Sequence, residues 1–295
     1  MDKNKNMSKN IIITGPTSGI GRETALALAQ QGHQLFLLCR NQQAGDKLIQ
    51  EISAIAGAKV PQLLLADLGN FAQIAKAAAD FLARNIPLDV LINNAGIVNN
   101  TRVVDEGIEQ MFRVNHLGHF LLVNLLLENI KQSQGRIVVV ASGAHAFCPG
   151  IQFDDINFEK DFATFKAYGH SKLANMLMVH ELAKRLQGTG VVVNSLHPGM
   201  VATHLGGQNK AWYTPILMKL MQIIAISPEK GAQTVIYLAT TDQVKTSGGY
   251  YYRCKTHGSK RWARSDADAQ RLWQLSEQLL QHYLPLPIKG ESHDG

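Results

Sequence analysis

Near its start the chain reads Ile11-Ile12-Ile13-Thr14-Gly15-Pro16-Thr17-Ser18-Gly19-Ile20-Gly21, and this stretch decides the fold of all 295 residues. Its β-branched first half predicts a short buried strand, and residues 22–30 are rich in alanine and leucine, which favours a helix. A strand, a glycine-rich turn and a helix in this order can seat a pyrophosphate at the helix N-terminus, because glycines let the backbone approach the phosphates. We therefore expect a dinucleotide-binding turn here. A plain turn between a strand and a helix is the alternative.

Strands and helices alternate along the rest of the chain. The patterns predict strands at 34–39, 60–66, 88–92, 136–141, 191–196 and, as the last one, 248–252. They predict helices at 41–56, 70–84 and 105–130, around Tyr168 to Leu186, from Pro228 onward, and at 266–283, with an irregular excursion over 143–164. Such alternation predicts an α/β fold of Rossmann type, a doubly wound parallel sheet with helices on both faces. We see no repeat or linker, so we expect a single domain over 1–295 with flexible ends at 1–9 and 284–295.

Composition narrows the function classes. Hydrophobic residues make up 45% and charged residues 18%, which is ordinary for a soluble globular protein. The net charge is +6, but the basic residues are scattered, so we expect no nucleic-acid partner. Three widely spaced cysteines indicate a reducing compartment, with neither a disulfide framework nor a zinc site. We expect no signal peptide and no apolar run of the ~18–20 residues that a membrane span needs, and hence a cytoplasmic protein.

Basic residues near the second strand bear on the choice of cofactor. An acid at the end of this strand would hold the adenosine ribose hydroxyls, but Arg40 stands there instead, and Arg22 follows the glycine turn. Two guanidinium groups suit a 2′-phosphate, so we expect NADP(H) rather than NAD. The alternative is that these are ordinary surface arginines.

Polar residues follow later strands or lie inside helical patterns. Ligands of parallel sheets bind at the carboxyl ends of the strands, so Asp67 and Asn94 are placed to touch the cofactor, although both are also common turn residues. Asn115 falls inside a long apolar helix, where a buried amide needs partners and can be purely structural. His116 and His119 could share a helix face, but no carboxylate or cysteine completes a ligand set, so we interpret them as packing or surface residues.

Candidate proton-transfer residues come from the second half of the chain. Tyr168 and Lys172 are four residues apart on a helix and therefore share a face. A free phenol loses its proton near pH 10, and we expect the lysine ammonium, together with a cationic nicotinamide ring, to lower this pKa. Ser142 stands at the carboxyl end of a strand and would face the cofactor cleft. The alternatives are a surface Tyr/Lys pair and a serine that only caps a loop.

With these pieces placed, the chain resembles the short-chain dehydrogenase/reductase family over nearly its whole length. The matching motifs, in chain order, are Thr14-Gly15-x-x-x-Gly19-Ile20-Gly21, Asp67-Leu68, Asn93-Asn94-Ala95-Gly96, Asn115, Ser142, Tyr168-x-x-x-Lys172 and Pro198-Gly199. Pro16 departs from the usual alanine and removes an N–H donor from the turn.

The resemblance implies a role for each matching residue. Tyr168 would be the general acid/base, Lys172 would bond the nicotinamide ribose and depress the tyrosine pKa, and Ser142 would orient the substrate oxygen. Asn115 would hold a water that links Lys172 to solvent. With the arginines above, the cofactor-binding set is Gly15, Thr17, Ser18, Gly19, Ile20, Gly21, Arg22, Arg40, Asp67, Leu68, Asn94, Ala95, Gly96, Tyr168, Lys172, Pro198, Gly199, Val201 and Thr203, the last two meeting the nicotinamide amide.

Several features look closest to the retinol dehydrogenase-like branch. These are Cys39-Arg40, the long interval from Ser142 to Tyr168, and the runs at 168–175 and 197–203. The resemblance implies NADP-dependent interconversion of lipophilic aldehydes or ketones and alcohols. Two alternatives stay open: another reductase branch acting on a steroid, quinone or acyl-thioester, and an NADP-binding sensor or scaffold with weak catalysis.

The segment 200–227 corresponds to the substrate lid of this family. It is rich in apolar residues, which implies an apolar substrate, because burying a polar one without partners is costly. A helix packed on the core, or docked on a membrane or a partner, is the alternative. Peripheral membrane contact is therefore compatible with the sequence, and family analogy implies a homodimer or homotetramer.

Overall fold

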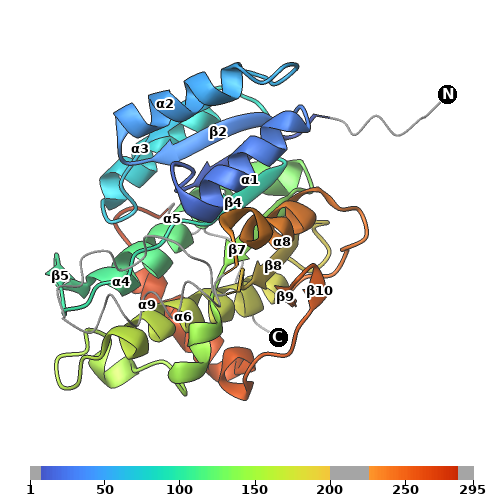
Figure 1. Cartoon of the computed structure of the whole chain (residues 1–295). Helices are drawn as coiled ribbons and strands as arrows, with labels where there is room; N and C mark the ends of the chain where they lie inside the picture. Colours follow the sequence, from blue (N-terminus) through green and yellow to red (C-terminus); the bar gives the residue numbers. More distant parts are fainter. Residues whose placement is uncertain (1–7, 200–225, 285–295) are drawn as a thin grey trace.

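The structure, a computed structural model, describes residues 8–199 and 226–284. Figure 1 shows a central sheet covered by helices on both faces. The strands of this sheet are β1 (Asn10–Thr14), β2 (Gln34–Cys39), β3 (Gln62–Leu65), β4 (Val90–Asn93), β7 (Arg136–Val140), β8 (Val192–Leu196), β9 (Tyr250–Tyr252) and β10 (Lys255–Thr256). Their order is β10-β9-β8-β7-β4-β1-β2-β3, and every pair is parallel except β9 with β10. The predicted Rossmann-type doubly wound sheet is thereby confirmed.

The helices form two layers. On one face lie α1 (Gly19–Gln30), α2 (Gln42–Ser53) and α8 (Pro228–Thr240). On the other lie α3 (Phe71–Leu82), α5 (Gly118–Gln132), α6 (Thr164–Arg185) and α9 (Asp266–Leu279). Each layer buries its own apolar cluster against the sheet, so the strands in the middle are buried on both faces. This explains why β1 is a continuous apolar run rather than an alternating pattern.

The strand order reverses direction between β1 and β4. From β1 the chain proceeds outward to β2 and β3, and then returns across β1 to β4 and continues to β7. In register, Ile13 pairs with Ile92 of β4, and Asn93 pairs with Val139 of β7. The carboxyl ends of these strands therefore meet at a switch point, where open α/β sheets bind their ligands.

The predicted helix over 105–130 is wrong in its first part. A small hairpin, β5 (Val104–Asp105) and β6 (Ile108–Glu109), comes first, followed by α4 (Gln110–Phe112), a π-helix (Arg113–Leu117) and then α5. Glu106 and Gly107 both have positive φ, at 46° and 79°, which is the backbone of a tight two-residue hairpin turn. The glycine was the local signal, and the length of the apolar pattern concealed it.

The strand at 250–252 is not the last one, which corrects a second prediction. Lys255–Thr256 returns antiparallel as β10 through Arg253 and Cys254, whose φ values are 48° and 60°. Neither residue is one that usually marks such a turn, so the sequence carried no sign of it. The excursion over 143–164 contains two short 3₁₀ turns, Gly143–Phe147 and Phe153–Asp155. Most of the proposed lid, 200–225, lies outside the described residues.

Candidate functional site

The glycine turn after β1 is tied closely to the end of β4. Gly15 and Gly19 have φ of 62° and 54°, a region that glycine adopts at little cost. A Cβ on Gly21 would lie 2.1 Å from the carbonyl oxygen of Gly15, so no larger residue fits there. The Asn94 side-chain nitrogen donates to the carbonyl oxygens of Thr14 at 2.9 Å and Gly15 at 3.2 Å. Asn94, in the loop that follows β4, therefore fixes the shape of the glycine turn.

The N-terminus of α1 has no side-chain cap from its own N-cap residue. Ser18 is the N-cap residue, but its side chain makes no capping bond, and the first turn contains no acidic residue. The first N–H groups of a helix have no partner within the helix, so they can bind an anion. A glycine-rich turn that leads into a helix start without a Ser18 cap or an acidic residue in its first turn fits the pyrophosphate of a dinucleotide.

The predicted arginines differ in their surroundings. Arg40 has a side chain that is 71% exposed, and its Nη1 lies 3.8 Å from Oδ2 of Asp67. Arg22 is instead engaged by two carboxylates, with Nη1 2.7 Å from Glu23 Oε1 and Nη2 in close contact with Glu51 Oε1. Arg40 is therefore the more available cation of the two. Asp67 also accepts from the N–H of Gly69 at 2.8 Å, as a turn residue does.

Asn115 and Lys172 meet beside Gly96. The Asn115 amide accepts from Ile97 N–H at 2.8 Å and donates to Ile97 O and Ser171 Oγ, each at 3.0 Å. Lys172 is 3% exposed, and its Nζ donates to the carbonyl of Val140 at 3.0 Å. A Cβ on Gly96 would lie 3.2 Å from Lys172 Nζ and 3.4 Å from Asn115 Oδ1. The two polar groups therefore lie directly against the backbone of Gly96, where a larger residue would crowd them.

The π-helix (Arg113–Leu117) explains how Asn115 reaches this place. A single π turn inserts extra backbone into an otherwise α-helical segment, and such turns are frequent at functional sites. Here it turns the Asn115 amide toward the loop after β4 and α6. Sequence periodicity predicted a uniform helix and could not have found it.

Tyr168 contradicts one expectation about its acidity. Burial raises the pKa of the Tyr168 phenol, and a hydrogen bond with Ser142 lowers it by a smaller amount. We expected Lys172, together with a cationic nicotinamide ring, to depress this pKa, but Lys172 Nζ lies 5.8 Å from the centre of the tyrosine ring and donates to Val140 O. Among the chain's own groups, loss of solvent is therefore the largest influence on this pKa, and the contribution of the nicotinamide ring stays a prediction. Burial also lowers the pKa of Lys172 to about 8.

Ser142 has two partners. Its Oγ accepts from the N–H of Ala144 at 3.1 Å, so it caps the 3₁₀ turn that follows β7, as the alternative interpretation held. Its side chain is also hydrogen-bonded to the Tyr168 phenol. Ser142, Tyr168 and Lys172 thus come together from β7 and α6, which pack against each other.

Other predicted cofactor residues lie at the strand ends or in the core. Leu68 is 5% exposed, so only its backbone is free to face a ligand. Gly199, after β8, has a φ of 94°, and a Cβ there would lie 2.9 Å from Ile226 Cδ1. Val201 and Thr203 lie outside the described residues.

His197 is a residue that sequence reasoning did not single out. Its ring stacks on Tyr252 with centroids 4.2 Å apart and an interplanar angle of 14°. Burial lowers its pKa to about 4, so it is neutral at physiological pH. Its position directly before Pro198-Gly199 was the available signal.

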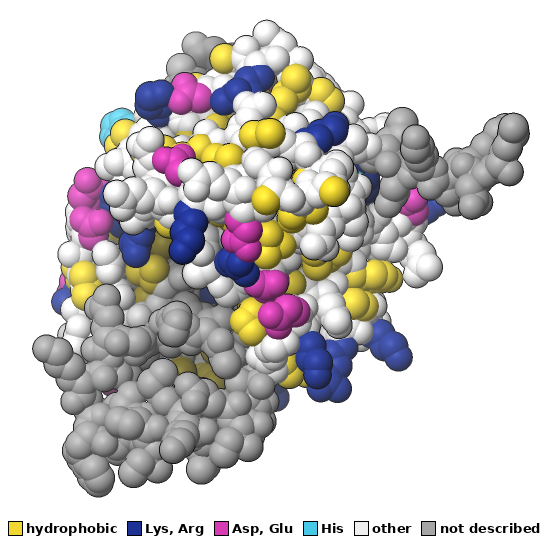
Figure 2. Space-filling model, turned by 45° about the horizontal axis from the view of Figure 1, so that its top comes forward, with side chains coloured by type: hydrophobic (Ala, Val, Ile, Leu, Met, Phe, Trp, Pro, Cys, Tyr) yellow, Lys and Arg dark blue, Asp and Glu magenta, His cyan; other side chains and the backbone are white. Residues whose placement is uncertain are grey.

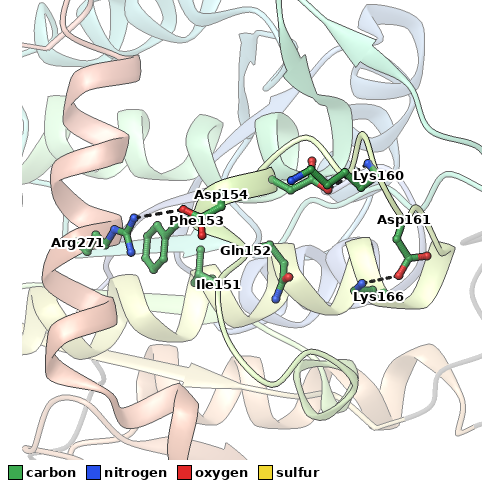
Figure 3. Close-up of a pocket in the computed structure, with 9 residues that line it drawn as sticks. Ile151, Gln152, Phe153, Asp154, Lys160, Asp161, Lys166 and Arg271 are labelled. Atoms are coloured by element: carbon green, nitrogen blue, oxygen red, sulfur yellow. Dashed lines mark hydrogen bonds and ion pairs between the residues drawn. The ribbon is translucent and has the colours of Figure 1, made fainter.

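A hollow elsewhere on the surface is distinct from this site. Figure 3 shows it between the 151–161 segment and α9, with a volume of about 370 Å³. Two of its cations are paired with its own carboxylates, Lys166 with Asp161 at 2.8 Å and Arg271 with Asp154 at 3.9 Å. None of the predicted site residues lines it. On the face in Figure 2, likewise, Lys and Arg side chains are scattered among acidic ones rather than gathered.

Residues 8–199 and 226–284 contain neither a candidate metal site nor a candidate membrane-spanning helix. No group of three or more His, Cys, Asp or Glu side chains in these ranges is arranged to hold a metal ion. None of their helices combines the length and apolarity required to cross a bilayer.

This chain is similar to known proteins in both its sequence and its structure. A family model described as short chain dehydrogenase matches residues 9–214. Retinol dehydrogenase 12 of Mus musculus is 40% identical over 278 residues, 92% of this chain and 86% of that protein. A solved structure of an uncharacterized protein from Mycobacterium paratuberculosis has a TM-score of 0.73 and 29% identity, covering 94% of this chain and 95% of that one. Another, described as an NAD(P)-dependent gluconate 5-dehydrogenase from Beutenbergia cavernae with bound NADP, has a TM-score of 0.66 and 25% identity, covering 80% and 91%.

Proposed function

Because this chain belongs to the short-chain dehydrogenase family, we propose that it is an NADP(H)-dependent oxidoreductase that interconverts lipophilic aldehydes or ketones and the corresponding alcohols. The observation that carries the proposal is the meeting of Tyr168, Ser142 and Lys172 at the carboxyl end of β7, beside the loop that follows β4. Acid-base groups in this position can act on an oxygen bound next to a nucleotide.

Three side chains of the protein have different roles in the proposed reduction. Tyr168 donates its phenolic proton to the substrate oxygen, and the Ser142 hydroxyl holds that oxygen in place. Lys172 would hold the nicotinamide ribose of a bound cofactor, and its ammonium stabilises the phenolate that remains. A bound nicotinamide cofactor would supply the hydride. In the oxidative direction the same tyrosine accepts the proton.

Preference for NADP(H) is supported by Arg40. It stands at the end of β2 with a largely exposed guanidinium, at the place where an acid would favour NAD. Bidentate pairing makes a guanidinium a good partner for phosphate. Bound NADP in the Beutenbergia cavernae structure agrees with this choice.

A lipophilic substrate is supported by the surroundings of Tyr168. The tyrosine packs beside a cluster formed by Met111, Phe158 and Ala167, with Ile97 and Phe162 at its edge. Ile97 and Phe162 are only partly buried, so they offer apolar surface beside the tyrosine, where a polar substrate would lose hydrogen bonds to water without replacement. Relatives named retinol dehydrogenases act, by their names, on a largely apolar alcohol.

The test is consumption of NADPH by the full chain with a panel of carbonyl compounds: a retinal, a long-chain aldehyde, a steroid ketone, a quinone, an acyl-thioester and a short polar aldehyde. We expect turnover with the lipophilic aldehydes or ketones. Tyr168→Phe should keep NADPH binding and lose roughly 10²–10⁴-fold in kcat, because it removes only the proton donor. Tyr237→Phe, on α8 across the sheet, is the matched control and should behave as wild type. NADPH binding without turnover of any compound would favour the sensor alternative, and wild-type rates in Tyr168→Phe would refute the mechanism.

A further inference from the structure

His119 joins two parts of the site that are far apart in the sequence. It lies at the start of α5 and is 1% exposed. One ring nitrogen, Nε2, lies 2.9 Å from the hydroxyl of Thr14, the last residue of β1. The other, Nδ1, lies 2.9 Å from the carbonyl oxygen of Asn115 in the π-helix. The imidazole therefore bridges the glycine turn and the segment that carries Asn115.

The partners fix the position of each proton. A carbonyl oxygen can only accept, so Nδ1 must carry the hydrogen that bonds to Asn115. Burial and the charge of Lys172 lower the pKa of His119 to about 4, so the ring is neutral and Nε2 is an acceptor. The Thr14 hydroxyl must then donate to Nε2.

The same assignment satisfies the rest of Thr14. Its oxygen accepts from the backbone N–H groups of Asn94 at 2.9 Å and Ala95 at 3.0 Å. These two donors occupy the lone pairs of the oxygen, and its single proton faces two acceptors, His119 Nε2 at 2.9 Å and the carbonyl oxygen of Ile92 at 3.4 Å. The shorter contact is the one to His119, so one proton arrangement links the loop after β4, the end of β1 and the π-helix.

We propose that His119 is a positioning residue of the reductase site, which as the Nδ1–H tautomer sets the spacing between the nucleotide-binding turn and the Asn115 segment beside Lys172. This proposal rests on the proposed function for its kinetic consequences but not for its hydrogen bonds. An imidazole presents a rigid donor and acceptor on opposite sides. An asparagine amide reaches only about the place of Nδ1, and a glutamine amide only about the place of Nε2.

Substitutions at 119 separate the two contacts. His119→Gln keeps an acceptor for Thr14, so NADPH affinity should stay near wild type while kcat falls roughly tenfold. His119→Asn keeps a donor for Asn115, so kcat should be largely retained while the dissociation constant of NADPH rises roughly tenfold. His119→Phe removes both and should show both losses. His33→Phe, a buried histidine that contacts Lys9 N–H instead, is the control and should change neither quantity.

A second measurement does not depend on activity or on any variant remaining folded. Nitrogen NMR of the ¹⁵N-histidine-labelled wild-type chain should show His119 with a protonated Nδ1 and a bare Nε2 that does not titrate between pH 8 and 5; His170, whose Nε2 accepts from Gln152 N–H, should give a second signal of this kind. The His119 signal is assigned by its absence from the His119→Phe spectrum or, if that variant does not fold, by its contact with the Thr14 hydroxyl. The opposite tautomer, or titration near pH 6.5, would overturn the proposal.

The outcomes separate this inference from the proposed function. If no carbonyl compound is reduced but the tautomer and the NADPH affinities behave as stated, only the proposed function fails. If the enzyme is active and the three variants lose affinity, kcat and stability in parallel, or lose nothing, the positioning role is refuted and the function stands.

Discussion

Tyr168 and Lys172 share an environment that disfavours charge on both. Burial raises the pKa of the phenol and lowers the pKa of the ammonium to about 8. Near neutral pH the tyrosine is therefore protonated while the lysine still carries its charge. This is the protonation state in which Tyr168, in the proposed mechanism, gives a proton to the substrate oxygen.

Reductive kcat/KM should consequently be constant at neutral pH and fall above about pH 8, as Lys172 loses its proton and can no longer stabilise the phenolate. The measurement is a pH–rate profile with NADPH and the best substrate of the panel. A Lys172→Arg variant with residual activity should lack this decline, because a guanidinium keeps its charge. The same decline in that variant would assign it to another group.

Arg40 governs cofactor choice if the 2′-phosphate lies at the end of β2. Arg40→Asp should move the ratio of kcat/KM for NADPH over NADH toward NADH by roughly 10–100-fold, because it replaces a charge-assisted contact with repulsion. Steady-state kinetics with both cofactors measure the ratio. Arg84→Asp makes the same charge change at a site next to Gln62 and should leave the ratio unchanged. Equal ratios in wild type and Arg40→Asp would refute the assignment.

At the scale of elements, α1 begins only because Gly21 has no side chain. Its missing Cβ lets the first turn of α1 lie against the carbonyl of Gly15, and Asn94 fixes the same carbonyl from the neighbouring loop. The turn, the helix start and the loop after β4 thus form one unit that depends on close backbone approach.

Gly21→Ala should therefore lower both NADPH affinity and the free energy of unfolding, the latter by about 1–3 kcal/mol, because a methyl group would meet backbone that cannot yield easily. Denaturant titration and NADPH fluorescence measure the two. Gly258→Ala is the control: nothing lies within 4 Å of its added Cβ, and its φ is not in the positive range that strains other residues. A stable Gly21→Ala chain with normal affinity would contradict the tight turn.

At the scale of the whole molecule, three of the buried histidines among the described residues lie on the π-helix, α5 and α6 and are kept neutral by burial. His116, His119 and His170 are at most 1% exposed, and burial lowers their pKa values to about 3, 4 and 3. His116 bonds to Ser276 Oγ on α9, and His170 accepts from the N–H of Gln152. These side chains connect α5 and α6 to the elements around them.

Acid should destabilise the fold before its carboxylates titrate. Below about pH 6.5 the unfolded chain takes up protons at these histidines, whereas the folded chain does not, so the free energy of unfolding falls with pH. Each histidine contributes about 1.4 kcal/mol per pH unit in this window, and the three together about 4 kcal/mol per pH unit. Urea titrations at pH 7, 6 and 5 measure the slope. His116→Gln should reduce this slope by about 1.4 kcal/mol per pH unit, and a pH-independent midpoint would contradict the buried neutral rings.

Sequence by itself determined the features that depend on local chemistry. The glycine turn, the alternation of strands and helices and the spacing of Tyr168 and Lys172 are local patterns, and they predicted the doubly wound sheet and the side of it that carries the site. The two positive-φ turns, at Glu106-Gly107 and Arg253-Cys254, escaped prediction, because tertiary contacts override weak local preferences.

Only the tertiary structure decided the protonation of the site residues and the contacts that fix their positions. The acidity of Tyr168 depends on how much solvent packing removes, which spacing to Lys172 cannot reveal. Arg22 is engaged by Glu51 from another helix. The sequence suggested that His119 is a packing or surface residue, yet its ring is hydrogen-bonded to Thr14, which lies 105 residues earlier in the chain. Hydrogen bonds between such distant residues follow from the packing of whole elements, and no local pattern encodes them.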